Sequence, residues 1–146
     1  MIKMEIKEIK IKRVKNLSNS QIYFLTKNNI IPTDWMELRE RVYVITNDEN
    51  EIVGTISFDR ADALIKRLFI IEKYRRQGYG TMLVQHCINV AKILNYNTIY
   101  TWIKTDNETS RNLFEKIGFA ETTRFNMDED NNVVSIKYKY VISGDE

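Results

Sequence analysis

The segment from Leu68 to Gly80 constrains this chain more than any other part of its sequence. It reads as an apolar strand, a basic turn with Arg75 and Arg76, two glycines at positions 78 and 80, and the start of a helix. Such a turn presents several backbone N–H groups to one point at the positive end of the helix dipole. Glycine lets the main chain approach a ligand closely, and the arginines add positive charge. The segment therefore predicts a phosphate-binding loop.

Two common nucleotide-binding patterns do not describe this loop. A Walker loop requires G-x-x-x-x-G-K-[ST], and the sequence contains no Gly-Lys-Ser or Gly-Lys-Thr. The dinucleotide fingerprint requires a third glycine three residues after the second, where Leu83 stands. The alternative to an anion site is a strand-to-helix turn whose arginines are simply solvated.

Composition and charge narrow the class of protein. The chain has 146 residues, enough for a single domain over residues 1–146 with its own core. Its 22 basic and 20 acidic residues give a net charge of +2, which does not indicate a nucleic-acid partner. No apolar run approaches the ~20 residues that cross a bilayer, and the N-terminus lacks the apolar region of a secretory signal. We expect a cytoplasmic protein without a membrane partner.

One cysteine and one histidine leave few parts for nucleophilic chemistry. Cys87 has no partner for an internal disulfide, and with His86 it does not form a zinc-binding cluster, so we predict no metal site. The apolar spacing of residues 80–94 is that of one helical face, and it includes Cys87. We therefore expect Cys87 in the core and His86 on the flank of that face.

The pattern of elements predicts an α+β domain with one mixed, twisted sheet. Strands are indicated over residues 6–14, 41–46, 51–58, 63–71, 98–103, 119–125 and 133–141. Helices are indicated over residues 18–27, 34–39, 80–94 and 107–117, the last ending at Gly118. Three consecutive strands, from residue 41 to 71, are separated by short turns, which favours antiparallel pairing. The helices should cover the faces of the sheet.

Two separate motifs carry a resemblance to a known family. The first is Arg75-x-x-Gly78-x-Gly80 after a strand ending in Leu68-Phe69-Ile70, and the second is Asn107 followed by a helix ending in Lys-x-Gly-Phe. Both are similar to the motifs of the GNAT superfamily of N-acetyltransferases, and the element order over residues 5–142 agrees. The resemblance implies a centrally splayed mixed β-sheet of about seven strands, flanked by about four helices. It also implies transfer of an acetyl group from acetyl-CoA to a primary amine by direct attack.

The resemblance further implies which residues hold the acetyl-CoA cosubstrate. Main-chain groups at the end of the fourth strand would bind the pantetheine arm, and one N–H would face the acetyl carbonyl, where charge develops. The turn amides would bind the pyrophosphate. Asn107 would contact the cofactor, a role compatible with capping the following helix, and Phe114 would pack beside the thioester arm. The full set is Leu68, Phe69, Ile70, Arg75, Arg76, Gln77, Gly78, Tyr79, Gly80, Asn107 and Phe114.

The positions where the family keeps its acid and base are apolar in this chain. Phe114 stands where many members have a tyrosine that protonates the departing thiolate. Trp102 and Leu64 stand where members acting on protein N-termini or on histones have a glutamate. Other ionisable residues near these positions are Asp59, Asp62, Glu72, Tyr100 and Tyr138. The catalytic residue is not identified by sequence; Asp62, Glu72 and Tyr138 are the candidates.

Two functions therefore remain open. The first is an active acetyltransferase whose acceptor is a small molecule or a peptide amine, and the second is a non-catalytic acyl-CoA-binding regulatory module. Without a strong general base, an enzyme should favour an amine of low pKa. At pH ~7.5 an α-amine is roughly a quarter neutral, against about one part in a thousand for a lysine-like amine. Homodimers are common in the resembling family, so a homodimer is compatible with the sequence.

Overall fold

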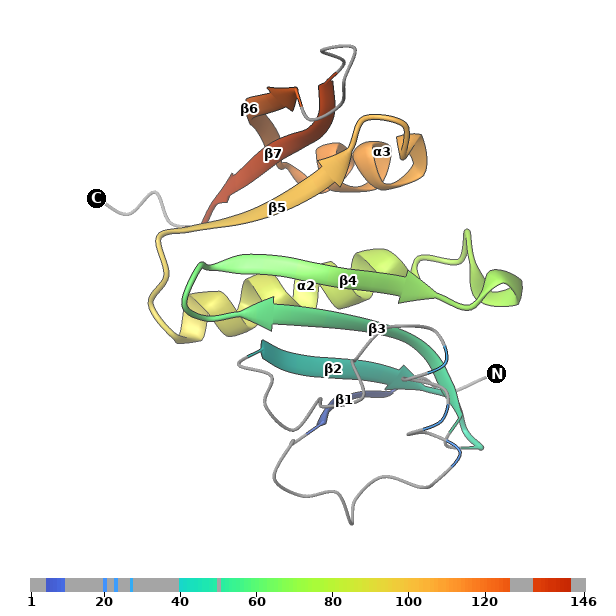
Figure 1. Ribbon diagram of the computed structural model, residues 1–146. Helices are drawn as coiled ribbons and strands as arrows, with labels where there is room; N and C mark the ends of the chain where they lie inside the picture. Colours follow the sequence, from blue (N-terminus) through green and yellow to red (C-terminus); the bar gives the residue numbers. More distant parts are fainter. Residues whose placement is uncertain are drawn as a thin grey trace.

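Seven strands form one sheet in the order β1-β2-β3-β4-β5-β7-β6 (Figure 1). The computed structural model describes residues 5–9 (backbone only), 20, 23, 27, 40–49, 51–126 and 133–142. The strands are β1 (Glu5–Ile9), β2 (Glu40–Thr46), β3 (Ile52–Asp59), β4 (Leu64–Ile70), β5 (Thr98–Lys104), β6 (Ala120–Asn126) and β7 (Val133–Val141). The helices with described bounds are the 3-10 helix η3 (Glu72–Tyr74), α2 (Tyr79–Ile93) and α3 (Glu108–Ile117).

The sheet is mixed, as the sequence predicts. Strands β1 to β4 pair with one another antiparallel in sequence order, and β7 pairs antiparallel with both β5 and β6. The pair β4–β5 is parallel, because α2 returns the chain to the same end of the sheet between these two strands. The α+β class and the sheet of seven strands are confirmed.

The half of the sheet from β2 to β4 packs on α2. Every residue of β3 is buried, and so are Ile45 on β2 and Ile65 on β4. Helix α2 places Leu83, Val84, Cys87, Ile88 and Ala91 in this core, the one-face spacing expected of an amphipathic helix. Cys87 is fully buried, which raises the pKa of its thiol to about 12 and keeps it protonated. His86 is half-buried, with its ring 4.5 Å from that of Tyr43.

The other half of the sheet consists of β5, β7 and β6, and it packs on α3. Phe114 and Phe119 meet edge to face with ring centroids 5.0 Å apart, and both are buried with Ile136. Gly118 ends α3 at φ +126°, a conformation that favours glycine, and its N–H donates to the carbonyls of Phe114 and Glu115. The predicted C-terminal cap is confirmed.

The remaining differences from the sequence prediction lie at element ends. The helix expected from Asn107 starts one residue later, because Asn107 is its N-cap. Ser20, Tyr23 and Lys27 are helical, in agreement with a helix over residues 18–27. Residues 10–14 of the first predicted strand and the helix predicted over residues 34–39 lie outside the described residues. No helix in the described part is long and apolar enough to span a membrane.

Candidate active site

The two halves of the sheet separate between β4 and β5. These parallel strands pair only at Leu64 with Tyr100 and at Ile65 with Thr101. Two hydrogen bonds connect the strands at these pairs. The Tyr100 N–H donates to the Ala63 carbonyl at 2.8 Å, and the Thr101 hydroxyl donates to the Ile65 carbonyl at 3.0 Å. Beyond these pairs the strands diverge toward their carboxyl ends (Figure 1). The central splay that the resemblance implies is therefore present.

A bulge in β4 accompanies the divergence. Between the pairs Ser57–Lys66 and Thr55–Phe69, two residues of β4, Arg67 and Leu68, stand against a single residue of β3. An extra residue of this kind bends a strand and increases its local twist. From Lys66 to Ile70, β4 has β3 on one side and no paired strand on the other in the described part. Main-chain groups on that side therefore have no strand partner among the described residues.

Arg67 occupies the bulge in a left-handed conformation, with φ +58°. A residue with a Cβ atom loses about 1–2 kcal/mol there. Its side chain reaches β2, where Nε donates to Glu40 Oε1 at 2.9 Å and Nη2 to Oε2 at 3.5 Å. The fork-to-fork pair with a buried carboxylate holds the bulge in place.

The loop after β4 is shaped by its own side chains. Arg75 turns back on the strand: its Nε donates to the Ile70 carbonyl at 2.8 Å, and its guanidinium lies 5.8 Å from the centroid of the Phe69 ring. Gln77 Nε2 donates to the Lys73 carbonyl at 3.2 Å. Two of the residues predicted to bind the cofactor, Arg75 and Gln77, therefore have side chains that hold the loop in shape.

The loop amides lie at the start of α2 and are free to bind an anion. Gly78 is the N-cap, at φ +89°, and no side chain caps the helix. In the described part, no main-chain carbonyl accepts from the N–H groups of residues 76–80. A Cβ atom added at Gly78 would have no neighbour within 4 Å, so the space in front of it is open. These features fit the pyrophosphate of CoA.

Gly80 has a different neighbourhood from Gly78. It is buried, and a Cβ atom there would lie 2.9 Å from Leu113 Cδ1 of α3. Its small size therefore serves the close approach of α2 to α3 as well as any approach of a ligand. Tyr79, between the two glycines, packs its ring edge to face on Tyr74, with centroids 6.2 Å apart.

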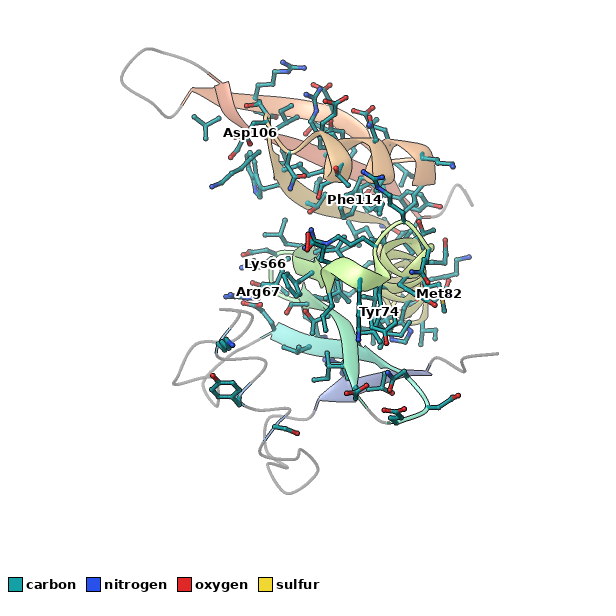
Figure 2. The ribbon with its side chains drawn as sticks, turned by 90° about the vertical axis from the view of Figure 1, so that its right-hand side faces the viewer. Lys66, Arg67, Tyr74, Met82, Asp106 and Phe114 are labelled. Carbon is teal, nitrogen blue, oxygen red and sulfur yellow. The ribbon has the colours of Figure 1, made fainter. Side chains whose placement is uncertain are left out.

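The second motif contributes one exposed and one buried residue. Asn107 Oδ1 accepts the Ser110 N–H at 3.1 Å, which caps α3, while the residue itself is exposed. Phe114 is only 3% exposed. Figure 2 shows it between α3 and the half of the molecule that carries β4 and α2. Phe114 thus lies at the boundary of the two halves, with its ring packed on Phe119.

Two of the catalytic candidates lie at opposite ends of β4. Asp62 is in the turn before the strand, near the paired end, and Glu72 is in η3 after it. A strand of this length separates them by about 20 Å. Glu72 lines an open pocket of about 620 Å³ together with Ser20, Tyr23, Lys27, Phe69, Ile71 and Arg75. The structure does not bring these two candidates together.

Asp59 is a poor general base because its carboxylate is fully engaged. It is 2% exposed, and Oδ1 accepts from the N–H groups of Ala61 and Asp62 while Oδ2 accepts from Lys66 Nζ at 3.3 Å. Burial alone would raise its pKa, but these hydrogen bonds outweigh burial and lower the pKa. Lys66 Nζ also lies 3.9 Å from Glu40 Oε2, so one ionic cluster joins β2, β3 and β4.

Tyr138 points to α3 and is held there. Its hydroxyl donates to Glu115 Oε2 at 2.6 Å and accepts from Arg111 Nε at 3.3 Å. Burial, followed by the hydrogen bond to Glu115, raises the pKa of the phenol. The phenol proton of Tyr138 is thus donated to a carboxylate on α3, and this hydrogen bond connects the helix to β7.

Sequence reasoning missed the ionic cluster of Glu40, Asp59, Lys66 and Arg67. Lys66 and Arg67 come from the strand that separates from β5, and Figure 2 shows them next to each other in the half of the molecule that carries β4. Glu40 and Arg67 are 27 residues apart. No local sequence pattern indicates that pair. Among the described residues, no group of three or more His, Cys, Asp or Glu side chains is placed to hold a metal ion.

The sequence of this chain is similar to that of a known protein family. Residues 12–119 match the acetyltransferase (GNAT) family. This chain belongs to that family. Its enzyme class is therefore N-acetyltransferase, and acetyl-CoA is the acetyl donor that the family uses.

Individual relatives differ in what they acetylate. An N-alpha-acetyltransferase from Sulfurisphaera tokodaii is 26% identical over 128 residues, covering 77% of this chain and 72% of that protein. The ribosomal-protein-S18-alanine N-acetyltransferase of Escherichia coli has the same fold, with a TM-score of 0.68, 18% identity and coverage of 97% and 95%. Spermidine N-acetyltransferase from Vibrio cholerae, in complex with CoA and spermine, has a TM-score of 0.65, 14% identity and coverage of 94% and 95%.

Proposed function

We propose that this protein transfers the acetyl group of acetyl-CoA to an α-amino group, that of a peptide or of a small molecule. The observation that carries the proposal is the parallel pair β4–β5, which stops after two residue pairs beside a helix start with unpaired amides. This arrangement supplies main-chain donors along an extended arm and an anion site at its end.

Different residues of the proposed site bind different parts of acetyl-CoA. The amides of residues 76–80 bind the pyrophosphate, with the helix dipole of α2 behind them. The open side of Leu68, Phe69 and Ile70 orients the pantetheine arm, and an N–H from this segment meets the negative charge that develops during acyl transfer. Asn107 and Phe114 border the arm from the other half of the sheet. When bound, acetyl-CoA supplies the acetyl group as a thioester.

We choose an α-amine as the acceptor because the ionisable side chains of Asp59, Glu40 and Tyr138 already form hydrogen bonds within the protein. Asp59 is held by Lys66, and Glu40 by Arg67. The proton of Tyr138 is held by Glu115. With these groups engaged, the protein offers proximity and positioned donors rather than a strong base, so an acceptor that is already partly neutral reacts best. The similarity to an N-alpha-acetyltransferase supports the same choice.

The test is kcat/KM for matched α-amino, ε-amino and polyamine acceptors from pH 6.5 to 9.5. For the α-amine, log kcat/KM should rise with unit slope and level off near the pKa of the amine, about 8. At pH ~7.5 the α-amine should exceed the ε-amine by more than a hundredfold. CoA release that depends on added amine distinguishes an enzyme from an acyl-CoA-binding module. Efficient polyamine acetylation that is already level at pH 7 would reject the proposal.

A further inference from the structure

One face of the half-sheet β5–β7–β6 carries lysines and aromatic rings. The register pairs Tyr100 with Lys139, Trp102 with Lys137 and Lys104 with Ser135, so these side chains share a face. The opposite face carries Tyr138, whose hydroxyl is bonded to α3. We call the first surface the lysine face; it consists of Tyr100, Trp102, Lys104, Lys137 and Lys139.

The three lysines of the lysine face, Lys104, Lys137 and Lys139, have no ion-pair partner among the described residues. The β6 residues that face Lys139 and Lys137 are Ala120 and Thr123, both uncharged. Lys104 and Lys139 are exposed, and Trp102 is 39% exposed. The face is thus open and basic.

Aromatic rings fix the central lysine of this face. Lys137 Nζ lies 4.4 Å from the centroid of the Tyr100 ring and 5.7 Å from that of Trp102. Cation–π contact holds the ammonium in one place, yet leaves it able to meet an anion. A positioned cation of this kind loses less entropy on binding than a freely rotating lysine.

The lysine face begins where the strands separate. Tyr100 pairs with Leu64 at the closed end of the splay, and Trp102 is the first residue of that face beyond the last β4–β5 pair. Across the splay, the same face of β3 is closed to solvent, because Thr55 and Ser57 are 0% exposed and Asp59 is 2% exposed. An acceptor whose amine reaches the splay therefore has open surface over β5 and β7, and none over β3.

We propose that the lysine face binds an acidic segment of a polypeptide acceptor, directly after the residue whose α-amine is acetylated. This inference rests on the proposed function and specifies its substrate as a protein or peptide N-terminus. Alternate residues of β5 lie about 7 Å apart, so three extended acceptor residues span the face. Carboxylates at acceptor positions 2 to 4 would meet the three lysines.

The test compares two peptides that differ only in charge, Ser-Glu-Glu-Glu and Ser-Gln-Gln-Gln, each with the same neutral tail. An exposed ion pair contributes roughly 1.4- to 5-fold. The wild type should therefore acetylate the acidic peptide with kcat/KM about tenfold above the neutral one. Replacing Lys137 and Lys139 together with Gln should reduce this ratio to about twofold, mainly through KM. The matched control replaces Lys92 and Lys116, exposed lysines near the ends of α2 and α3, and should keep the wild-type ratio.

Two further measurements keep the inference falsifiable if the double variant folds poorly. In the wild type, raising the salt concentration to ~0.5 M should remove most of the preference for the acidic peptide, because exposed charges are screened. A variant with Lys137→Glu and Lys139→Glu should instead prefer Ser-Lys-Lys-Lys. A wild-type ratio near one, or a ratio unchanged by Lys137→Gln with Lys139→Gln, would overturn this inference and leave the proposed function intact. Turnover of spermidine without turnover of either peptide would overturn both.

Discussion

The loop before α2 makes a sharp prediction for Gly78→Val. The backbone at Gly78 has φ +89°, so any residue with a Cβ atom costs about 1–2 kcal/mol there, and a β-branched residue lies at the upper end. No atom lies within 4 Å of the added Cβ, so the free protein suffers no further clash. The melting temperature of the free variant should fall by only about 4–8 °C.

The loss of CoA binding should be much larger than this loss of stability. CoA at a hundred times its Kd stabilises a wild-type protein by about 2.7 kcal/mol, which corresponds to a rise of roughly 10 °C in Tm for a chain of this size. In Gly78→Val that rise should vanish, because the side chain occupies the open space in front of the amides. Differential scanning fluorimetry gives the shift, and isothermal titration calorimetry gives the affinity.

Gly118 provides a matched control for backbone strain. It also has positive φ, +126°, but it caps α3, and its added Cβ would meet the ring of Tyr140 at 3.2 Å. Gly118→Ala should lower Tm by several degrees, as we expect of Gly78→Val, yet keep the full CoA-dependent rise. If Gly78→Val bound CoA as tightly as the wild type, the pyrophosphate would bind elsewhere and this account of the loop would be wrong.

Four other substitutions test individual contacts. Tyr138→Phe removes the 2.6 Å hydrogen bond to Glu115 and should lower the unfolding free energy, measured by chemical denaturation, by about 1–3 kcal/mol. Its kcat should stay within about twofold of wild type. A hundredfold loss of kcat would instead identify Tyr138 as catalytic. Asp59→Asn should destabilise the protein by about 1–3 kcal/mol at pH 7. The pKa of Asp59 is lowered in the folded protein, so its contribution to stability is present above pH ~4 and is lost as pH falls through the folded pKa. The difference in unfolding free energy between wild type and Asp59→Asn should therefore shrink in acid. A difference that does not depend on pH would exclude an ionic origin. Thr55→Val removes a buried hydroxyl that has no hydrogen-bond partner in the described part of the chain, and it should raise stability by about 1 kcal/mol. A loss of stability measured in urea would instead reveal a partner such as bound water. Phe114→Tyr should keep the fold and leave turnover equal or higher. A large loss of kcat with unaltered CoA affinity would show that the catalytic geometry differs from the one proposed.

The sequence predicts those parts of the site that depend on local backbone pattern. The strand, the turn and the helix from Leu68 onward follow from apolar runs and glycines, and Asn107 and Gly118 follow from capping preferences. The burial of Cys87 follows from the helical periodicity of residues 80–94. Each of these features is set by residues within a few positions of one another, so the sequence alone is sufficient.

Features that depend on distant pairs could not be predicted in the same way. The bond between Arg67 and Glu40 joins β4 to β2 across the sheet, and the one between Tyr138 and Glu115 joins a strand to a helix. The bulge at Arg67 has no local sequence signal, because the residue is neither glycine nor asparagine. The sequence therefore leaves three scattered catalytic candidates, Asp62, Glu72 and Tyr138, and the structure shows that the hydroxyl of Tyr138 is already hydrogen-bonded to Glu115 and Arg111.

The separation of β4 from β5 also bears on how the protein avoids unwanted association. A strand with one unpaired side can recruit a strand from another molecule, which is the common beginning of aggregation. Here such an edge lies in the interior of the sheet order, along Lys66 to Ile70. The bulge at Arg67 breaks its regular spacing, and charged residues stand at its start. The bulge that accompanies the separation of β4 from β5 therefore also makes the unpaired side of β4 a poor template for another β-strand.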